Sequence, residues 1–255
     1  MNERKSQRLE RIENALRDSG ALRLKDASEM LGVSEMTIRR DISSCDGVFR
    51  YLGGYIVKCH DSSQNSFYVF DRERESHIEN KRMACELAAS FIEPRDTIFI
   101  DCGTTMPHLA RRIASDWRVT VVCFSLNIAN VICKIPNTTL IMLGGVYQPS
   151  SASFSSAEAL EMLRTIGINK AFLSAGGIDP THGASCSNFH EVPIKQEAIH
   201  RAVQKYLVVD SSKIGKVRPA FFAGLDEFDA VVIDRDISPE NRELLTNDSF
   251  RLVTD

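Results

Sequence analysis

Apolar positions in the first sixty residues recur with the spacing of short α-helices. Leu9, Ile12 and Leu16 lie three to four residues apart, as on one face of a helix, and a Ser-Gly pair at residues 19–20 ends this helix after about four turns. The next stretch predicts a short extended segment and then a second helix that ends at Gly32. A tight turn and a third helix follow, which gives the helix-turn-helix arrangement.

The third helix combines a cap, an inner face and a polar outer face. Ser34 begins it as an N-cap, because its hydroxyl oxygen can accept a hydrogen bond from the backbone N–H of Thr37. At 100° per residue, Ile38 and Ile42 share one face and pack on the first two helices. The residues that project away from this core are Met36, Thr37, Arg40 and Ser43.

A β-hairpin is predicted directly after this helix. The segment VFRYLGGYIVK has two strand-like halves around a Gly-Gly pair at residues 53–54, which is the composition of a hairpin turn. A hairpin after a recognition helix indicates a wing that lies against a DNA backbone. The wing residues in that position would be Arg50, Tyr51, Tyr55 and Lys58.

The order of helix, helix, capped helix and hairpin favours DNA binding, whereas an isolated arginine pair would favour a merely solvated surface. Arg40 is expected to donate two hydrogen bonds to a guanine in the major groove, which would contribute ~1 to 3 kcal/mol of discrimination. Arg39, Lys25 and the N-terminal arginines are expected to contact phosphates, and Asp41 to orient an arginine. The predicted DNA-binding residues are Lys25, Ser34, Met36, Thr37, Arg39, Arg40, Ser43 and Tyr55.

Charge and composition indicate two domains. Residues 1–60 contain 11 Lys and Arg against 9 Asp and Glu, whereas the rest of the chain has a net charge of −5, which places any nucleic-acid contact in the first segment. The polar segment CHDSSQNS lacks periodicity and predicts a linker. We expect a winged helix-turn-helix domain at residues 1–58, a linker at 59–76, and a sensor and oligomerisation domain at 77–255.

Beyond the linker, short unbroken apolar runs alternate with helical stretches. A charged helix over residues 72–91, with Ile78 on its inner face, comes first. The runs are TIFID, VTVVCF, TTLIML, KAFLSA, KYLVVD and DAVVID, with helices at residues 106–114 and 192–205 among them. This alternation predicts a parallel sheet covered on both faces, which binds ligands at the carboxyl ends of its strands.

Glycine- and hydroxyl-rich segments stand at four of these strand ends, namely DCGTT, LGG, SAGG and VVDSSKIG. In DCGTT, Gly103 permits close backbone approach and two threonines begin a helix, where an anion is favoured, although a capped turn explains the segment equally well. In VVDSSKIG, Lys213 can neutralise a phosphate and Asp210 can accept from sugar hydroxyls, or the two pair with each other. Together the four ends predict a phosphorylated-sugar pocket. Its expected residues are Asp101, Gly103, Thr104, Thr105, Gly144, Gly145, Gly176, Asp210 and Lys213.

The segment VSEMTIRRD is similar to the signature of the DeoR-type bacterial repressors, in which a small residue precedes T-[apolar]-R-[R/K]-D-[apolar]. D-x-G-T-T, L-G-G, S-A-x-G and D-x-S-K-x-G, in this order, are similar to the sensor half of these regulators, which resembles the sugar-phosphate isomerase fold. The resemblance implies a repressor of a sugar or deoxynucleoside catabolic operon, with operator DNA, a phosphorylated sugar and further copies of the chain as partners. No cofactor is expected.

Finer similarities within the family favour deoxyribose-5-phosphate as the effector. They are YLGGYIV, DCGTT followed by Pro107, and GKVRPA. Two segments, FDRERESH and SFSSAEAL, depart from the pattern, so that a paralogous repressor with another phosphosugar stays open.

An isomerase-like enzyme is the main alternative, because a carboxylate or lysine near a sugar carbonyl can transfer a proton. The available groups are Asp101, Asp179, Glu191 and Lys195. Glu191 and Lys195 are four residues apart on a predicted helix, which favours an ordinary surface pair. A protein-binding adaptor is a third possibility, but it would need acidic residues in place of the arginine face, and the sequence lacks them.

Cysteine, metal and membrane chemistry are not expected. The seven cysteines form no CxxC pair, and Cys102 is better explained as a buried residue than as a nucleophile. His182, Cys186 and His190 lack a fourth ligand for zinc. No apolar run approaches the ~18 residues of a membrane helix, and the N-terminus is too charged for a signal peptide. A cytoplasmic protein is expected.

Overall fold

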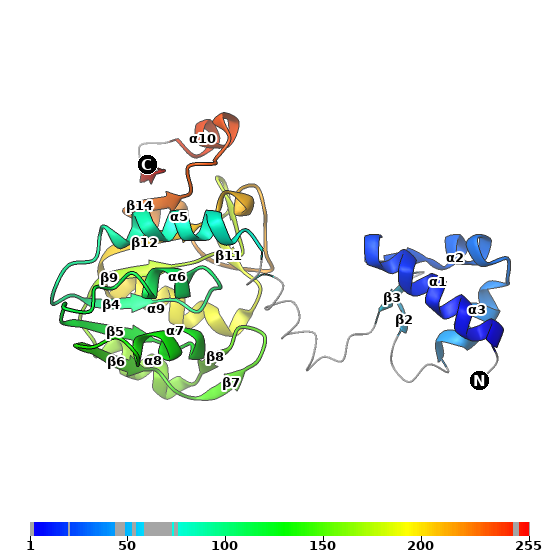
Figure 1. Cartoon of the computed structure of the whole chain (residues 1–255), viewed down its shortest axis with the longest axis horizontal. Helices are drawn as coiled ribbons and strands as arrows, with labels where there is room; N and C mark the ends of the chain where they lie inside the picture. The colour runs from blue at the N-terminus through cyan, green and yellow to red at the C-terminus, as the bar shows by residue number, and fades with distance from the viewer. Residues whose placement is uncertain are drawn as a thin grey trace. The chain divides into compact units, whose positions relative to one another are not determined.

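The computed structural model describes residues 3–19, 21–43, 49–52, 55–58, 73, 76–246 and 250–254. The chain divides into two compact units at Tyr68–Val69 (Figure 1). Most of the expected linker at 59–76, together with the turn of the expected wing at residues 53–54, lies outside the described residues. Each unit is therefore considered by itself.

The N-terminal unit contains three helices and three short strands. They are α1 (Glu3–Ser19), β1 (Ala21–Arg23), α2 (Leu24–Leu31), α3 (Glu35–Ser43), β2 (Phe49–Leu52) and β3 (Tyr55–Lys58). The strand β3 pairs antiparallel with both β1 and β2, so that the hairpin joins a small sheet. The predicted order of helices and hairpin, a winged helix-turn-helix, is confirmed.

Two local features produce the tight turn before α3. Gly32 ends α2 in the left-handed region at φ 64°, a conformation that glycine adopts without steric strain. Ser34 then caps α3 as predicted, since its Oγ accepts from the backbone N–H of Thr37 at 3.3 Å. The core beneath this turn consists of Ile12, Leu16, Leu24, Ala27, Ile38, Ile42 and Ile56.

The second unit is built on a seven-stranded sheet in the order β15-β14-β12-β9-β4-β5-β6 (Figure 1). Every pair of neighbours is parallel, as the unbroken apolar runs predicted. The strands are β4 (Thr97–Ile100), β5 (Val119–Cys123), β6 (Thr138–Met142), β9 (Ile168–Leu173), β12 (Ala202–Val209), β14 (Ala230–Ile233) and β15 (Arg251–Val253).

Helices cover both faces of this sheet. One apolar core packs α5 (Ile78–Ala89), α6 (Met106–Ala110) and α7 (Leu126–Ile132) on one face. The other core packs α8 (Ala157–Arg164) and α9 (Val192–Arg201) on the opposite face. The α/β architecture is therefore confirmed.

Smaller elements decorate this frame and were not predicted. The strands β7 (Val146–Gln148) and β8 (Ser153–Ser155) form a hairpin after β6. A second small sheet contains β10 (Gly177–Asp179), β11 (Gly183–Cys186) and β13 (Ala220–Ala223). The remaining elements are α10 (Pro239–Leu245) and the short 3₁₀ helices η1 (Phe189–Glu191), η2 (Ser211–Lys213) and η3 (Leu225–Glu227).

Three predicted helices are shorter than expected. The first sensor helix begins at Ile78, whose side chain is 45% exposed rather than inward, because it occupies the first turn. The helix expected at 106–114 ends at Ala110, and the helix expected at 192–205 ends at Arg201, because β12 begins at Ala202. No helix among the described residues is long and apolar enough to cross a membrane.

Candidate functional site

The outer face of α3 is open to solvent. Met36 is 73% exposed, and Arg39, Arg40 and the neighbouring Lys25 on α2 are exposed as well. Thr37 is half-buried, because its hydroxyl contacts the capping Ser34 at 2.9 Å. The side chains of Ser43 and Tyr55, which were also expected to contact DNA, lie outside the described residues.

An ion pair fixes α3 against α1. Asp41 is 6% exposed, and its Oδ2 accepts from Arg8 Nη2 at 2.6 Å and from Arg8 Nε at 2.8 Å. Asp41 therefore orients an arginine, as predicted. Arg11 donates to the carbonyl of Met30 on α2 at 2.9 Å. Arg8 and Arg11 thus join α1 to α3 and to α2, and the contact of the N-terminal arginines with phosphates stays a prediction.

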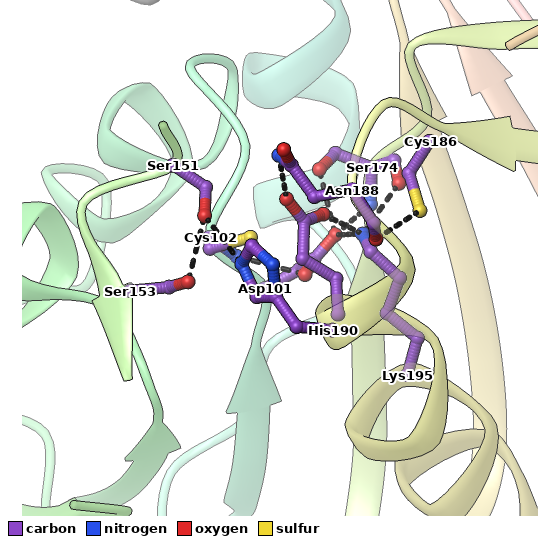
Figure 2. Close-up of polar contacts among 10 residues, drawn as sticks. Asp101, Cys102, Ser151, Ser153, Ser174, Cys186, Asn188, His190 and Lys195 are labelled. Atoms are coloured by element: carbon purple, nitrogen blue, oxygen red, sulfur yellow. Dashed lines mark hydrogen bonds and ion pairs between the residues drawn. The ribbon is translucent and has the colours of Figure 1, made fainter. Parts of the chain in front are cut away.

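A buried polar cluster lies at the carboxyl ends of β4 and β9 (Figure 2). Asp101 is fully buried, and its Oδ1 accepts from the backbone N–H of Cys102 at 2.8 Å. Its Oδ2 accepts from the backbone N–H and the hydroxyl of Ser174, at 2.8 and 2.7 Å, and from Nζ of Lys195. We call Asp101, Ser174, Glu191 and Lys195 the Asp101 cluster. Both oxygens of Asp101 are occupied, which favours a positioning role over direct ligand contact.

Lys195 comes from α9 and joins two strands. Its side chain is 1% exposed, and its Nζ also donates to the carbonyl of Ser174 at 3.1 Å and lies 3.7 Å from Glu191 Oε2. The ring of Phe222 lies 4.8 Å from the same nitrogen. Glu191 is itself only 5% exposed, so the expected surface pair is wrong. The four-residue spacing was read correctly, but this face of the helix packs on the sheet.

Asp101 and Lys195 each stabilise the charged form of the other. Burial alone would raise the pKa of Asp101, but Lys195 and the hydrogen bonds from Ser174 outweigh it, and the net pKa is lowered. Burial alone would lower the pKa of Lys195, but the neighbouring Asp101 outweighs it, and the net pKa is raised. The lowered pKa makes Asp101 a weak base and the raised pKa makes Lys195 a weak acid, so neither is suited to exchange a proton near pH 7.

The β7–β8 hairpin brings two hydroxyls to this cluster. Ser151 Oγ lies 2.7 Å from Ser153 Oγ and 3.2 Å from His190 Nε2, and both serines are buried (Figure 2). Burial lowers the pKa of His190. On the other side, Asn188 donates to Glu191 Oε1 at 2.6 Å. The cluster therefore continues into a set of neutral polar groups that suit sugar hydroxyls.

The thiols near the cluster are buried and unreactive. Burial raises the pKa of Cys102 well above its ordinary value, and it raises the pKa of Cys186 to about 11. Cys102 is 1% exposed, in agreement with the expected buried cysteine. No group of His, Cys, Asp and Glu side chains among the described residues is arranged to hold a metal ion.

Different structural features exclude a side chain at three glycines of the expected pocket. A Cβ on Gly103 would lie 2.0 Å from Ser174 Oγ, and one on Gly176 would lie 2.9 Å from Arg218 Cγ, so both positions require a close approach. Gly145, at φ 135°, lies against the backbone of Ser155 in the β7–β8 hairpin.

The hairpin accounts for Gly145 without a ligand, whereas a Cβ on Gly144 would meet nothing within 4 Å. Gly144 and Gly145 follow β6, which is separated from β4 by β5 in the sheet. Within the described residues, no hydrogen bond joins them to the Asp101 cluster. The structure thus does not gather all four predicted strand ends into one set of contacts.

The helix after DCGTT gives little support to an anion site by its dipole. α6 has only 5 residues, so its N-terminal charge is small. Thr104 is half-buried, and Thr105 is buried with its carbonyl accepting from Cys85 Sγ at 3.3 Å. Any strong attraction for a phosphate must therefore come from side-chain cations.

Such cations lie at the end of β12, in what we call the Lys213 cluster, formed by Glu73, Lys81, Asp210 and Lys213. Lys213 is 6% exposed and its Nζ donates to Glu73 Oε2 at 2.7 Å, whereas Asp210 Oδ1 accepts from the backbone N–H of Ser212 at 3.1 Å. The backbone N–H of Lys213 donates to the carbonyl of Asp210 at 3.0 Å, but the side chains of the two residues contact other partners. Lys81 on α5 is fully buried and donates to the carbonyl of Glu73.

Sequence reasoning missed Glu73, Lys81, Ser151 and Ser153, because the periodicity did not mark them as buried. It considered Glu191 and Lys195 only as a surface pair or as groups for proton transfer, His190 only as a zinc ligand, and Ser174 only as part of SAGG.

Family models match both units of the chain. Residues 8–58 match a DeoR-like helix-turn-helix domain, and residues 76–235 match the DeoR C-terminal sensor domain. The chain belongs to the DeoR family. The sensor match spans all the residues described above for the Asp101 cluster, and it includes Lys81, Asp210 and Lys213.

Individual members of the DeoR family differ in the sugar for which they are named. The chain is 39% identical over 234 residues to the deoxyribose operon repressor of Escherichia coli K12, covering 92% of each protein. It is 31% identical over 238 residues to a lactose phosphotransferase system repressor of Staphylococcus epidermidis, covering 90% of this chain and 92% of that one.

Among solved structures, ribose 5-phosphate isomerase A of Methanocaldococcus jannaschii is similar at a TM-score of 0.42 and 14% identity, covering 55% of each chain. A likeness this weak says nothing about the reaction or the ligand. Family membership therefore rests on the sequence matches.

Removal of the Asp101 charge should destabilise the sensor unit. Asp101→Asn leaves Lys195 buried with only Glu191 as a counter-charge, so we expect a loss of ~3 kcal/mol, at the lower end of the range for a broken buried pair. The free energy of unfolding in urea measures it. The matched change Glu79→Gln, at a side chain 70% exposed and paired with Arg82, should cost less than ~1 kcal/mol.

The difference in the free energy of unfolding between the parent and Asp101→Asn should depend on pH. Folding lowers the pKa of Asp101, so its contribution is present above the ordinary carboxyl range near pH ~4 and is lost as the pH falls through the folded pKa. The difference between the parent and Asp101→Asn should be full at pH 7 and shrink toward pH 3. Equal stability at pH 7 would contradict the assignment.

Proposed function

We propose that this chain is a DNA-binding transcriptional repressor of a sugar or deoxynucleoside catabolic operon and that a phosphorylated sugar releases it from DNA. The observation that carries the proposal is the exposed arginine face of the capped helix α3, on the same chain as a sensor domain with buried lysines at its strand ends. The matched relatives named as repressors support the same conclusion.

The DNA-binding half follows from helix geometry. Ile38 and Ile42 anchor α3 to the core, and the Arg8–Asp41 pair fixes its orientation, so that Arg40 and Met36 face outward. A homo-oligomer of at least two copies would present two such helices to major-groove faces ~34 Å apart or a multiple of it. Arg40 is assigned to a guanine, and Arg39 and Lys25 to phosphates.

The effector half follows from charge. Lys213 supplies a buried cation for a phosphate, and Asp210 supplies an acceptor for a hydroxyl. We assign Thr104 and Thr105 to the same phosphate, as the sequence predicts. Deoxyribose-5-phosphate is our preferred effector, because the deoxyribose operon repressor is 39% identical. The sugar must bind more tightly to the arrangement that cannot span the operator, since only differential affinity shifts an equilibrium.

Substitution of the base-reading arginine should remove operator preference. We expect Arg40→Ala to weaken operator binding by ~1 to 3 kcal/mol, roughly 5- to 150-fold, without altering sugar binding. Arg39→Ala should instead weaken operator and unrelated DNA alike and lower the salt dependence by about one phosphate contact. Fluorescence anisotropy with both duplexes measures the contrast. Undiminished operator preference in Arg40→Ala would remove Arg40 from this role.

Substitution of the sensor lysine should have the reverse effect. Lys213→Ala should bind the operator normally but resist release, because loss of a charge-assisted hydrogen bond weakens phosphosugar binding by ~1.5 to 3 kcal/mol, roughly 10- to 150-fold. Lys216→Ala, at an exposed position three residues on, is the control and should respond as the parent does. A wild-type response in Lys213→Ala would show that the pocket is misplaced.

The enzyme alternative predicts turnover, and we expect none. Asp101 is saturated by hydrogen bonds and Lys195 stays protonated, so these two candidates for proton transfer are engaged. Incubation with ribose-5-phosphate or deoxyribose-5-phosphate, followed by chromatography for the isomer, tests this. Production of isomer that is lost in Glu191→Gln would favour an isomerase.

A further inference from the structure

Glu73 binds both lysines of the Lys213 cluster. Its carboxylate Oε2 accepts from Lys213 Nζ at 2.7 Å, and its carbonyl accepts from Lys81 Nζ. In sequence, Glu73 stands between β3, which ends at Lys58 in the DNA-binding unit, and α5, which begins at Ile78 in the sensor. Glu73 thus belongs to the sensor unit, which begins at Val69, and it lies before the first helix of that unit.

The charge around Glu73 is that of an anion site. Lys213, Lys81 and Arg218 all act on its carboxylate; burial would raise the pKa of Glu73, but these cations outweigh it, and the net pKa is lowered. Asp210 acts on Lys81, and a third carboxylate, Asp234, accepts from the backbone N–H of Ser211 at 2.6 Å. Among the described contacts, Lys213 Nζ donates to the carboxylate of Glu73, whereas Lys81 Nζ donates to its carbonyl. An anion of higher charge that reached both ammonium groups would attract them more strongly than this single carboxylate does.

Asp210 supplies a second, independent sign of a ligand. It is fully buried, and its Oδ2 has no hydrogen-bond partner among the described residues. A buried carboxylate oxygen without a donor costs free energy that a hydroxyl donor would recover. A phosphate for the lysines and a hydroxyl for Asp210 are the two ends of a phosphorylated sugar.

We propose that Glu73 is the internal occupant of an anion site formed by Lys81 and Lys213, and that the phosphate of the effector displaces it. This inference rests on the proposed function of Lys213 and names how that site is regulated. Displacement breaks the Lys213–Glu73 contact, so the effector must compete with this internal carboxylate in order to bind.

Exposure identifies Glu73 as the partner that leaves. Its side chain is 40% exposed, whereas Lys213 and Lys81 are buried. A phosphate monoester carries about −1.5 to −2 charge near pH 7, against −1 for the carboxylate, so it has the stronger attraction for the two lysines. Because Glu73 is tethered, its effective concentration is high, and it sets a threshold concentration that the effector must exceed.

The test removes the charge of Glu73 and keeps its shape. Glu73→Gln retains the carbonyl that binds Lys81 and loses the carboxylate that competes for Lys213. Inorganic phosphate is the first probe, at constant ionic strength, with thermal stabilisation of the full-length protein as the readout. We expect half-maximal stabilisation at about tenfold lower phosphate in Glu73→Gln, since one charge-assisted hydrogen bond is removed from the competitor. Glu79→Gln, on exposed α5 surface, should behave as the parent within about twofold.

The second probe is deoxyribose-5-phosphate with operator DNA. Glu73→Gln should be released at a severalfold lower sugar concentration than the parent. A purely structural role predicts the opposite, because loss of the carboxylate would disorder the lysines and weaken phosphate binding. Equal or weaker phosphate binding by Glu73→Gln would overturn the inference.

The outcomes separate this inference from the proposed function. If the parent is released by the phosphosugar and Lys213→Ala is not, the proposed function stands whatever Glu73→Gln does. If the parent binds neither phosphate nor phosphosugar, or if Lys213→Ala responds normally, the effector site itself is wrong and the inference falls with it. Unchanged behaviour of Glu73→Gln beside a normal parent sinks only the internal-anion proposal.

Discussion

The sensor unit depends on the buried ion pair between Asp101 and Lys195. Neither charge is tolerable alone in that position, because an unpaired buried ion costs several kcal/mol. The pair therefore holds α9 against the carboxyl ends of β4 and β9. Ser174 completes the set of donors around Asp101. The hydroxyls of Ser151 and Ser153 lie beyond this set of donors, where Ser151 contacts both Ser153 and His190.

The fold was largely predictable, because its signals are local. The unbroken apolar runs predicted β4, β5, β6, β9, β12 and β14 of the parallel sheet. The order of cap, inner face and arginines predicted α3. Helix ends were less predictable: α9 gives way to β12 at Ala202, where extended pairing with β9 prevails over helical continuation. The β7–β8 hairpin was missed because its register depends on pairing with the rest of the chain.

The sequence predicted that Gly103 is a position of close backbone approach, which the structure confirms, but it did not predict the charge partners of the buried side chains. Glu191 and Lys195 have the spacing of a surface pair, and only packing on the sheet shows that they are buried. Lys81 stands in a stretch with charges on every side, so periodicity could not reveal that it is enclosed. The sequence left open a side-chain pair between Asp210 and Lys213. In the structure, the side chain of Lys213 instead pairs with Glu73, a residue far away in sequence.

The separations along the chain between bonded residues have a consequence for synthesis. The pair that fixes α3, Arg8 and Asp41, spans 33 residues, whereas Asp101 and Lys195 span 94 and Glu73 and Lys213 span 140. Contacts between distant segments form late, and they cannot form at all before the ribosome has delivered both ends. A nascent chain thus has every residue of its DNA-reading surface long before it has a complete metabolite site. Truncated products of interrupted translation would contain the DNA-binding unit without a complete sensor unit, and so would lack the proposed effector site.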